Sequence, residues 1–375
     1  MTRHTRTRRT RWLRPLAAML TLLILAAACG ETNGVTDDEP ADPADEDADA
    51  EDAAAPDVVE EGESRQITVS IFHPEGDPWT QIIQPFFDEV EERTAGRITF
   101  QPQYAGALAS VTDNLDVVSS GAVDMGLDLA STLSTQAPEF TYFEALGSYP
   151  QDYADQWDGI YEDLHPEFSS ILESQGVKLL VWGPGGSELI FFNGSEEFLT
   201  EPSDFEGLTL RTAGTWQGRQ IEALGGSSIS MDPGELYLAL QTGTVDATPQ
   251  AATLGLGASL YEVAPYLASI SMTFNTLLYI INPDVWDELS ADDQAIIEEA
   301  ARNASLAAPA TMQEQEQIAI DEMRSVDGVE HYRLTDEERE AIFEQIAPVL
   351  EEAAEISRDA SDEGARLVES IQARM

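Results

Sequence analysis

The sequence predicts an α/β protein, and three observations support this prediction. Short runs that alternate apolar and polar residues, such as Ile67, Val69 and Ile71, indicate strands. Stretches with apolar residues at helical spacing follow these runs, and glycines end them. The hydrophobic share of 42%, with 8% aromatic residues, is enough for a packed interior. Strands and helices therefore alternate along the chain from residue 67 onward.

In the first half, the strand at 67–71 precedes a helix that starts at Asp77-Pro78, has apolar positions as far as Val90 and stops at Gly96. The other elements expected in this half are a strand at 97–100, a short helix at 111–121, a strand at 122–127 and a buried strand at 178–182. The unit of strand, helix and strand is that of an α/β domain.

The second half of the sequence predicts the same alternation of strands and helices. A strand at 208–212 and a helix at 215–226 precede a strand at 227–231. The next helix, at 232–243, has Asp232 as its N-cap, Pro233 at its first position and Glu235 at the capping-box position. From Asp292 onward the sequence predicts helices, whose apolar positions include Ile342, Ile346, Val349 and Leu350.

Two segments repeat a short pattern. SSGAVDM (119–125) and QTGTVDA (241–247) each end a helix with Gly and open an extended run with Val-Asp. The repetition reflects either two related lobes or only the common chemistry of such turns.

The chain has 375 residues, of which 19 are basic and 70 acidic, so its formal net charge is −51. Nucleic acid is an unsuitable partner, because binding a phosphate backbone needs clustered basic residues and Lys178 is the only lysine. Cys29 is the only cysteine, which excludes an intramolecular disulfide, a cysteine-based zinc site and a CxxC redox pair. With only four histidines in addition, we expect neither a metal nor a cofactor.

The N-terminus carries the opposite charge. Six arginines precede an apolar run from Leu16 to Ala28. This order of basic, apolar and small residues predicts an export signal over residues 1–28. The thirteen residues of the run make a helix of about 20 Å, shorter than a hydrocarbon core of about 30 Å, and no later run is longer. We therefore expect no membrane-spanning segment in the mature protein.

LAAAC at 25–29 resembles a bacterial lipobox, in which the cysteine, here Cys29, is lipidated and becomes the new N-terminus. An ordinary signal peptide with a chance cysteine is the alternative, and Arg8-Arg9 also suits the twin-arginine export route. Residues 31–66 hold fifteen acidic residues, one basic residue and almost nothing apolar. The acidic cluster DPADEDADAED within this stretch could suggest a calcium loop, but it lacks the central Gly and the terminal bidentate Glu of that motif. We expect 29–66 to be a lipidated, disordered tether that holds the folded part away from the membrane.

Residues 201–247 resemble the signature region of the DctP-type solute-binding proteins of tripartite ATP-independent periplasmic (TRAP) transporters. The shared features, in order, are a Pro-x-Asp-x-x-Gly-Leu approach, a strand bearing Arg, a helix, Leu-Gly-Gly, Met, a Glu-x-Tyr-x-Ala-Leu-Gln-x-Gly helix and Val-Asp. Elsewhere, FFDEVEERTAGRITFQPQYAGAL and GAVDM resemble the first lobe of that family, and YEVAPYL and INPDVWDELSADDQAIIEEAA its later part. The resemblance covers nearly everything from Ile67 to the C-terminus.

This resemblance implies a two-lobed fold like that of periplasmic binding proteins, with a hinge, an interlobe ligand cleft and long C-terminal helices. The parts are then lobe I at 67–187, lobe II at 188–275, and at 276–375 a return segment and helices that brace both lobes. The implied function is capture of a small organic acid or zwitterionic solute by lobe closure and its delivery to a TRAP membrane permease. The alternatives are an ABC-type or sensor-linked binding lipoprotein, or a lipid-anchored hydrolase. We expect no enzyme, because GxSxG, HExxH, P-loop and GxGxxG motifs are absent.

Arg211 is the main candidate for ligand binding. A guanidinium group offers a planar fork of donors to a carboxylate, stays charged, and is less costly to desolvate than an ammonium group. In the family that the sequence resembles, the Arg of this strand typically binds the ligand carboxylate, and LTLRT matches that position. The alternative is a structural arginine paired with a nearby acid.

The sequence also departs from the family pattern. Many relatives have a second Arg in a Gly-x-Arg turn where this chain has Glu188, which either accepts a ligand ammonium or hydroxyl group or faces solvent. Gln250 stands where the family has a carboxamide contact, and Pro233 occupies a position that is aromatic in some relatives. Further candidates for the ligand cleft are Trp216, Phe274 and Asn275.

Overall fold

The computed structural model describes residues 63–375, apart from 187, 232 and 274. The predicted signal peptide, the predicted lipidation site Cys29 and nearly all of the predicted tether lie outside the described residues, as do Asp232 and Phe274. The tether was expected to extend to residue 66, but the first strand already begins at Arg65.

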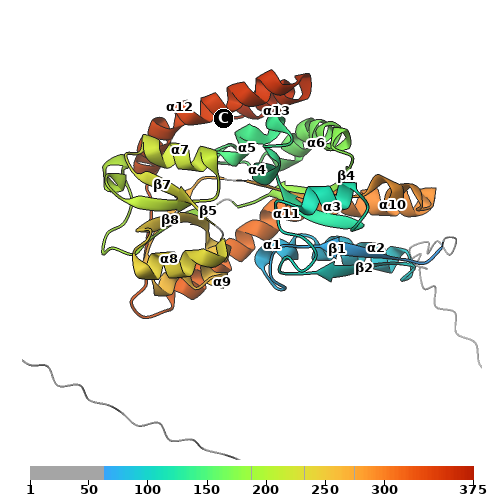
Figure 1. Ribbon diagram of the computed structural model, residues 1–375, viewed down its shortest axis with the longest axis horizontal. Helices are drawn as coiled ribbons and strands as arrows, with labels where there is room; N and C mark the ends of the chain where they lie inside the picture. Colours follow the sequence, from blue (N-terminus) through green and yellow to red (C-terminus); the bar gives the residue numbers. More distant parts are fainter. Residues whose placement is uncertain (1–62, 187, 232, 274) are drawn as a thin grey trace, which may run out of the picture. The chain divides into compact units, whose positions relative to one another are not determined.

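The first sheet carries most of the first half of the chain (Figure 1). Its strands, in spatial order, are β2 (Ile98–Gln103), β1 (Arg65–Ser70), β3 (Met125–Leu129), β10 (Thr276–Ile281) and β4 (Lys178–Pro184). β1 is parallel to β2 and β3, and β10 is antiparallel to β3 and β4. The accompanying helices are α1 (Pro78–Gln81), α2 (Gln84–Arg93), α3 (Asn114–Ser119), α4 (Ala130–Leu133), η1 (Pro138–Phe140), α5 (Thr141–Glu144) and α6 (Trp157–Ser174).

The second sheet follows in the sequence. Its strands, in spatial order, are β11 (Glu330–Arg333), β9 (Tyr266–Ser271), β5 (Glu188–Asn193), β8 (Ala247–Ala251), β6 (Thr209–Thr212) and β7 (Ser227–Ser230). β5 is antiparallel to β8 and β9, whereas β6 is parallel to β7 and β8. The accompanying helices are η2 (Pro202–Phe205), α7 (Thr215–Ala223), η3 (Pro233–Glu235), α8 (Leu236–Thr242), α9 (Ala252–Gly257) and η4 (Leu260–Glu262).

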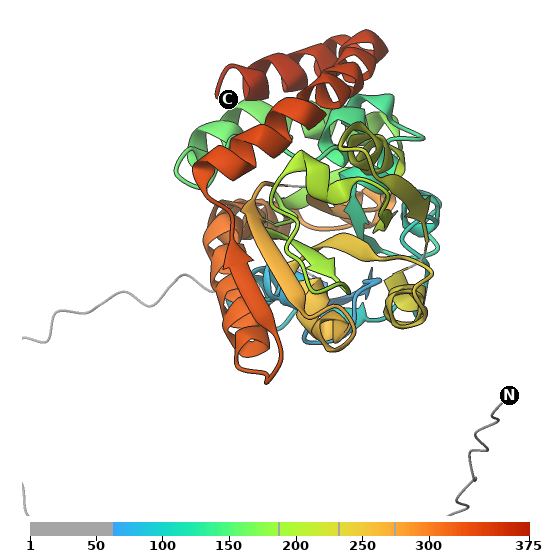
Figure 2. The same cartoon turned by 90° about the vertical axis from the view of Figure 1, so that its left-hand side faces the viewer.

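Two chain crossings and the C-terminal helices join the sheets. The chain crosses from β4 to β5 and returns from β9 to β10, and the Gly185 amide donates to the Asn275 carbonyl oxygen at 3.3 Å. After α10 (Pro283–Asp287), the long helix α11 (Ala291–Arg324) packs on β4 and α2 and also on α9. α12 (Asp336–Ala360) packs on α5 and α7, and α13 (Asp362–Gln372) on α6; both are red in Figure 2. The predicted two-lobed α/β fold with long C-terminal helices is confirmed.

Three local predictions differ from the structure. The helix expected after Asp77 is divided into α1 and α2, because Pro85 has no amide hydrogen to continue the helical bonding. The helix expected at 232–243 starts with the turn η3 and becomes α-helical only at Leu236, after Gly234, which has a low helix propensity. The last strand, β11, lies where only helices were expected, and its four residues are too few to give a periodic pattern.

The repeated Val-Asp pattern has the same structural role twice. Asp124 Oδ2 accepts a hydrogen bond from the Thr68 amide at 2.8 Å, where β3 begins beside the parallel strand β1. Asp246 Oδ2 accepts from the Thr209 amide, also at 2.8 Å, where β8 begins beside the parallel strand β6. The two lobes therefore start corresponding strand pairs with the same contact.

Candidate functional site

Arg211 lies one residue before the end of β6 and is 3% exposed. Its Nε and Nη2 atoms donate to the Met231 carbonyl oxygen at 3.1 and 2.9 Å. The Arg211 carbonyl oxygen accepts from Thr248 Oγ1 at 3.2 Å. Because two of its donors meet one acceptor, the plane of the guanidinium group is fixed. A buried guanidinium with a fixed orientation is suited to bind a carboxylate.

The strand register places three of the predicted site residues on one face of the second sheet. Gln250 is paired with Ile190 of β5, and Glu188 lies two residues before Ile190, on the same side. Leu210 is paired with Ala247, so the next residue, Arg211, shares a side with Gln250.

These three residues also lie at the same edge of the sheet. Arg211 and Gln250 are each the last residue but one of parallel strands, and Glu188 is the first residue of the antiparallel strand β5. The carboxyl edge of parallel strands is where α/β proteins bind ligands, and here it is the edge at which the chain crosses to the first sheet.

Glu188 is 7% exposed, so the alternative that it faces solvent is wrong. Its Oε2 atom accepts from Arg333 Nη2 at 3.0 Å and from Ser271 Oγ at 3.3 Å. Burial raises the pKa of Glu188, and the guanidinium of Arg333 opposes this shift. Glu188 lines a cavity of about 290 Å³ together with Gln151, Ser271, Gln313, Glu316, Gln317, Ile320 and Arg333. With two carboxylates and one guanidinium, this cavity suits a solute group that donates hydrogen bonds.

The other predicted site residues have structural contacts in the described part of the chain. Asn275 Oδ1 accepts from the amides of Thr276 and Ser131, at 2.9 and 3.3 Å, and so holds the crossing between β9 and β10. Trp216 is buried among the side chains that fill the first lobe around α6, and the guanidinium of Arg219 lies 4.6 Å from its ring centre. Phe274 lies outside the described residues.

Sequence reasoning missed three charged residues near these positions. Arg333 and Glu316 line the cavity beside Glu188, although they lie 145 and 128 residues away in the chain. Glu144 contacts the start of α7, where its Oε1 atom accepts from the Trp216 amide at 2.9 Å. No local signal marks these contacts, because each depends on how distant segments pack.

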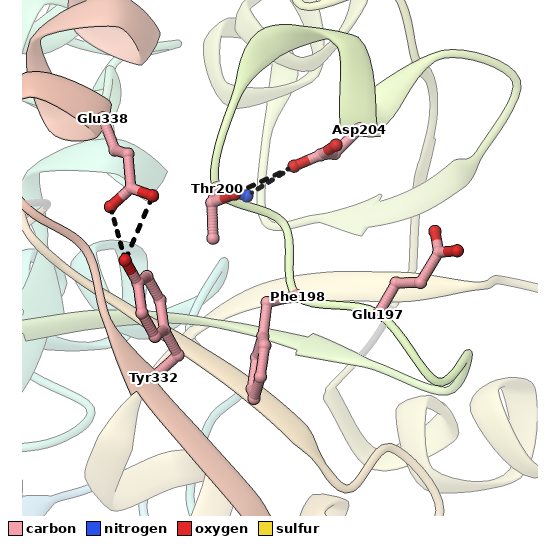
Figure 3. Close-up of a pocket in the computed structure, with 6 residues that line it drawn as sticks. All are labelled: Glu197, Phe198, Thr200, Asp204, Tyr332 and Glu338. Atoms are coloured by element: carbon pink, nitrogen blue, oxygen red, sulfur yellow. Dashed lines mark hydrogen bonds between the residues drawn. The ribbon is translucent and has the colours of Figure 1, made fainter.

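A larger hollow of about 510 Å³ lies on the second lobe (Figure 3). The rings of Phe198 and Tyr332 form one wall, with their centres 5.6 Å apart. Two of its three carboxylates already bind backbone amides: Asp204 accepts from Thr200 at 2.8 Å, and Glu338 from Thr335 at 2.8 Å. Figure 3 shows the Tyr332 hydroxyl directed at Glu338, to which it donates. We therefore regard this hollow as structural.

Within residues 63–375, apart from the three omitted positions, no group of three or more His, Cys, Asp or Glu side chains is placed to hold a metal ion. No helix in the part of the chain that the structure describes has the length and apolar character needed to cross a bilayer.

Comparison with known proteins gives consistent results. The family model described as bacterial extracellular solute-binding protein, family 7 (DctP), matches residues 69–356. The C4-dicarboxylate-binding periplasmic protein DctP of Rhodobacter capsulatus is 28% identical over 279 residues, which cover 72% of this chain and 80% of the relative.

Two solved structures share the fold. A TRAP periplasmic solute-binding protein from Sulfitobacter sp. NAS-14.1, with bound β-D-galacturonate, has a TM-score of 0.69 and 22% identity, covering 82% of this chain and 100% of the other. The periplasmic ectoine-binding protein of the TeaABC TRAP transporter of Halomonas elongata has a TM-score of 0.72 and 23% identity, covering 82% and 98%.

Proposed function

This chain belongs to bacterial extracellular solute-binding protein family 7, the DctP family, and from that premise we propose that it captures a small solute bearing a carboxylate and delivers it to a TRAP membrane permease. The two lobes close around the solute and exclude water before the protein docks on the permease. Members of the family are binding proteins and not enzymes, so the alternative of a hydrolase is wrong. The family match also favours the TRAP alternative over an ABC-type or sensor-linked lipoprotein.

The observation that carries the proposal is the buried, oriented guanidinium of Arg211. In our proposal, the solute carboxylate binds this group, while the Met231 carbonyl keeps the guanidinium plane in place. Its position at the carboxyl edge of β6 agrees with the family's typical ligand contact.

The overall charge of the protein opposes an anionic solute. Removal of the predicted signal takes away six arginines and no acidic residue, which leaves 13 basic and 70 acidic residues and a formal charge of −57. At about 4 Å and an effective dielectric constant near 20, however, one guanidinium attracts a carboxylate by about 4 kcal/mol. Exposed charges are screened over about 8 Å in physiological salt. Local binding at Arg211 therefore prevails over repulsion by the surface.

We assign the second end of the solute to Glu188. By the family resemblance, this carboxylate stands where many relatives have a second arginine, and it lines a cavity of about 290 Å³. A solute with a hydroxyl or ammonium group in addition to its carboxylate fits a guanidinium at one strand and a carboxylate at another. Uronates and zwitterionic acids are therefore the preferred solute classes. Gln250, on the same face, is proposed as a polar contact between the two ends, and Trp216, Asn275 and Phe274 as supporting residues of the cleft.

The proposed location is the outer face of the cell membrane, which agrees with the extracytoplasmic family. Cleavage of the signal peptide before Cys29 and lipidation of that cysteine would anchor the protein, with residues 31–66 as the tether. Mass spectrometry of the mature N-terminus tests this: a diacylglyceryl group on Cys29 is expected, and an unmodified Cys29 would contradict it.

Titration calorimetry tests the binding proposal. The panel contains D-glucuronate, D-galacturonate, C4-dicarboxylates, amino acids and ectoine, measured with the wild-type protein and with Arg211→Ala. We expect Arg211→Ala to lower the affinity for the tightest-binding acid about 100-fold or more, because the loss of a buried charge partner costs about 2–5 kcal/mol.

Arg366→Ala is the matched control. Arg366 lies on α13, its side chain is 50% exposed, and it pairs with Glu167. We expect this variant to bind like the wild type. Equal affinities of Arg211→Ala and the wild type would remove Arg211 from the site.

A further inference from the structure

The helix that follows the strand of Arg211 does not cap its own N-terminus. α7 begins after Gly214, which has no side chain to accept a hydrogen bond, and its first turn contains no acidic residue. The first amides of a helix have no partner within the helix and carry partial positive charge. Their partner is therefore water, a ligand or a group from elsewhere in the protein.

The first lobe supplies this partner. Glu144, the last residue of α5, is 6% exposed, and its Oε1 atom accepts from the Trp216 amide at 2.9 Å. Its Oε2 atom accepts from Ser134 Oγ at 3.1 Å. The approach requires glycine at 214, since a Cβ atom there would lie 2.4 Å from Glu144 Oε1. Burial raises the pKa of Glu144, and the hydrogen bonds from Trp216, Ser134 and Thr215 oppose that shift.

A second contact repeats the connection one turn later. The Leu146 amide donates to Gln220 Oε1 at 2.8 Å, and Gln220 Nε2 donates to the Leu146 carbonyl oxygen at 3.0 Å. The Gln220 side chain is fully buried, so these bonds satisfy a carboxamide that would otherwise be costly to bury. α7 is thus bound to the segment 144–146 at two successive turns.

The location of these contacts gives them a functional meaning. Residues 144–146 belong to the connection that leaves β3 of the first sheet, whereas α7 connects β6 and β7 of the second. Only Thr212, Ala213 and Gly214 separate Arg211 from α7. The contacts therefore join the lobes directly beside the strand that carries the proposed ligand-binding cation.

We propose that Glu144 is a positioning residue for ligand capture. By accepting the hydrogen bond at the start of α7, this residue of the first lobe holds the two lobes in the arrangement in which Arg211 meets the solute. This inference rests on the proposed function, but its first test needs no solute. The separation of the lobes is measured in the ligand-free protein.

Electron–electron resonance between two spin labels measures that separation. The full chain with Cys29→Ser is labelled at Asp116→Cys on α3 and at Gln241→Cys on α8, both of which are exposed. We expect Glu144→Ala to shift the distance distribution by several ångströms or to broaden it. Glu144→Gln, which retains an acceptor for the Trp216 amide, is expected to restore the wild-type distribution.

Asp128→Asn is the matched control, because it changes a buried carboxyl group of the first sheet whose oxygens have no hydrogen bond to α7 in the described part of the chain. It is expected to leave the distribution unchanged. If Glu144→Ala fails to fold, Gln220→Ala removes the neighbouring contact and gives the same readout. Distance distributions of Glu144→Ala and Gln220→Ala that are identical to that of the wild type would overturn the proposal.

Stopped-flow dissociation of D-glucuronate provides the second readout. Glu144→Ala is expected to dissociate about tenfold faster than the wild type, and Glu144→Gln within about twofold. The two proposals can fail separately. If Glu144→Ala shifts the label distance but no solute binds the wild type, Glu144 still holds the lobes together and the proposed function is contradicted. If a solute binds but Glu144→Ala leaves the label distance unchanged, the proposed function stands and the role of Glu144 is contradicted.

Discussion

The two lobes use the same strand-opening contact but bury different polar groups. Asp124 and Asp246 each accept one strand amide at 2.8 Å, at corresponding positions. In the core of the first sheet, Asp128 is fully buried, with neither carboxyl oxygen hydrogen-bonded, and burial raises its pKa to about 8. In the second sheet, the buried groups Arg211 and Glu188 have charge-matched or oriented partners. The first lobe thus buries an acid whose pKa is raised, and the second buries the guanidinium and the carboxylate to which we assign the two ends of the solute.

Asn114 is the polar neighbour that affects the pKa of Asp128. The Oδ1 atom of Asn114 is buried and has no hydrogen-bond partner, and its Nδ2 atom donates to the Leu127 carbonyl at 2.7 Å. Asn114 also contributes to the pKa of Asp128, which it lowers against the larger effect of burial. The comparison shows that burial alone does not identify a charged group that binds a solute. The hydrogen-bond and charge partners of a buried group determine whether it keeps its charge.

The largest expected effect is on stability, from Asp128→Asn. A carboxyl group whose pKa is higher in the folded state binds its proton more tightly there. Its contribution to the free energy of unfolding is therefore fully present at low pH. This contribution is lost as pH rises from about 4 to about 8, by several kcal/mol at about 1.4 kcal/mol per pKa unit. Denaturant unfolding at pH 5 and pH 8 should show this loss in the wild type but not in the variant. Parallel pH slopes in the two proteins would contradict a neutral Asp128.

Next in size is the effect of Glu188 on solute choice. Glu188→Gln removes the negative charge but keeps the shape, so binding of a solute with an ammonium group should weaken about 10- to 100-fold. A plain dicarboxylate should lose little or gain affinity. Competition calorimetry with both solutes measures whether Glu188→Gln changes the two affinities differently. An equal change for the two would assign Glu188 to structure, as the partner of Arg333.

The two strand-opening aspartates test how far the lobes correspond. Asp124→Ala and Asp246→Ala each remove a hydrogen bond from a strand amide to a carboxylate, so each should lower the free energy of unfolding by about 1 kcal/mol. Asp124 also lies 3.7 Å from Arg65, which adds a small surface contribution at most. Thermal and urea unfolding measure both variants. A large loss for one variant alone would contradict equal roles.

The smallest effect concerns the charge of the whole protein. Since the acidic surface repels an incoming carboxylate, salt should increase the association rate of D-glucuronate a few-fold by screening that repulsion. Stopped-flow measurements at increasing salt concentration give the slope. Slower association with added salt would indicate attraction by the surface.

The sequence predicted those parts of the fold that have a local pattern. Alternating residues identified β1, and the glycine-ended helix predicted at 215–226 is α7, Thr215–Ala223. The capped helix predicted at 232–243 becomes α-helical only at Leu236. Arg211 was predicted because its strand resembles a family position, and the structure adds the Met231 carbonyl that orients it. The repeated Val-Asp pattern allowed two interpretations, and the matching contacts of its aspartates support related lobes.

What the sequence could not predict depends on long-range packing. The cap of α7 comes from Glu144, 72 residues before Trp216, and nothing near either residue indicates the other. Likewise, the sequence does not show whether Glu188 faces solvent, because its partners Arg333 and Ser271 come from distant segments. The raised pKa of Asp128 follows from its complete burial, which the surrounding sequence does not distinguish from a surface position.

A crystal structure with the tightest-binding acid of the solute panel tests the central claim most directly. The account predicts a solute carboxylate within about 3.2 Å of the guanidinium nitrogens of Arg211, at the edge where the strands of the second lobe face the first. A carboxylate bound elsewhere, with Arg211 contacting only protein groups, would contradict it.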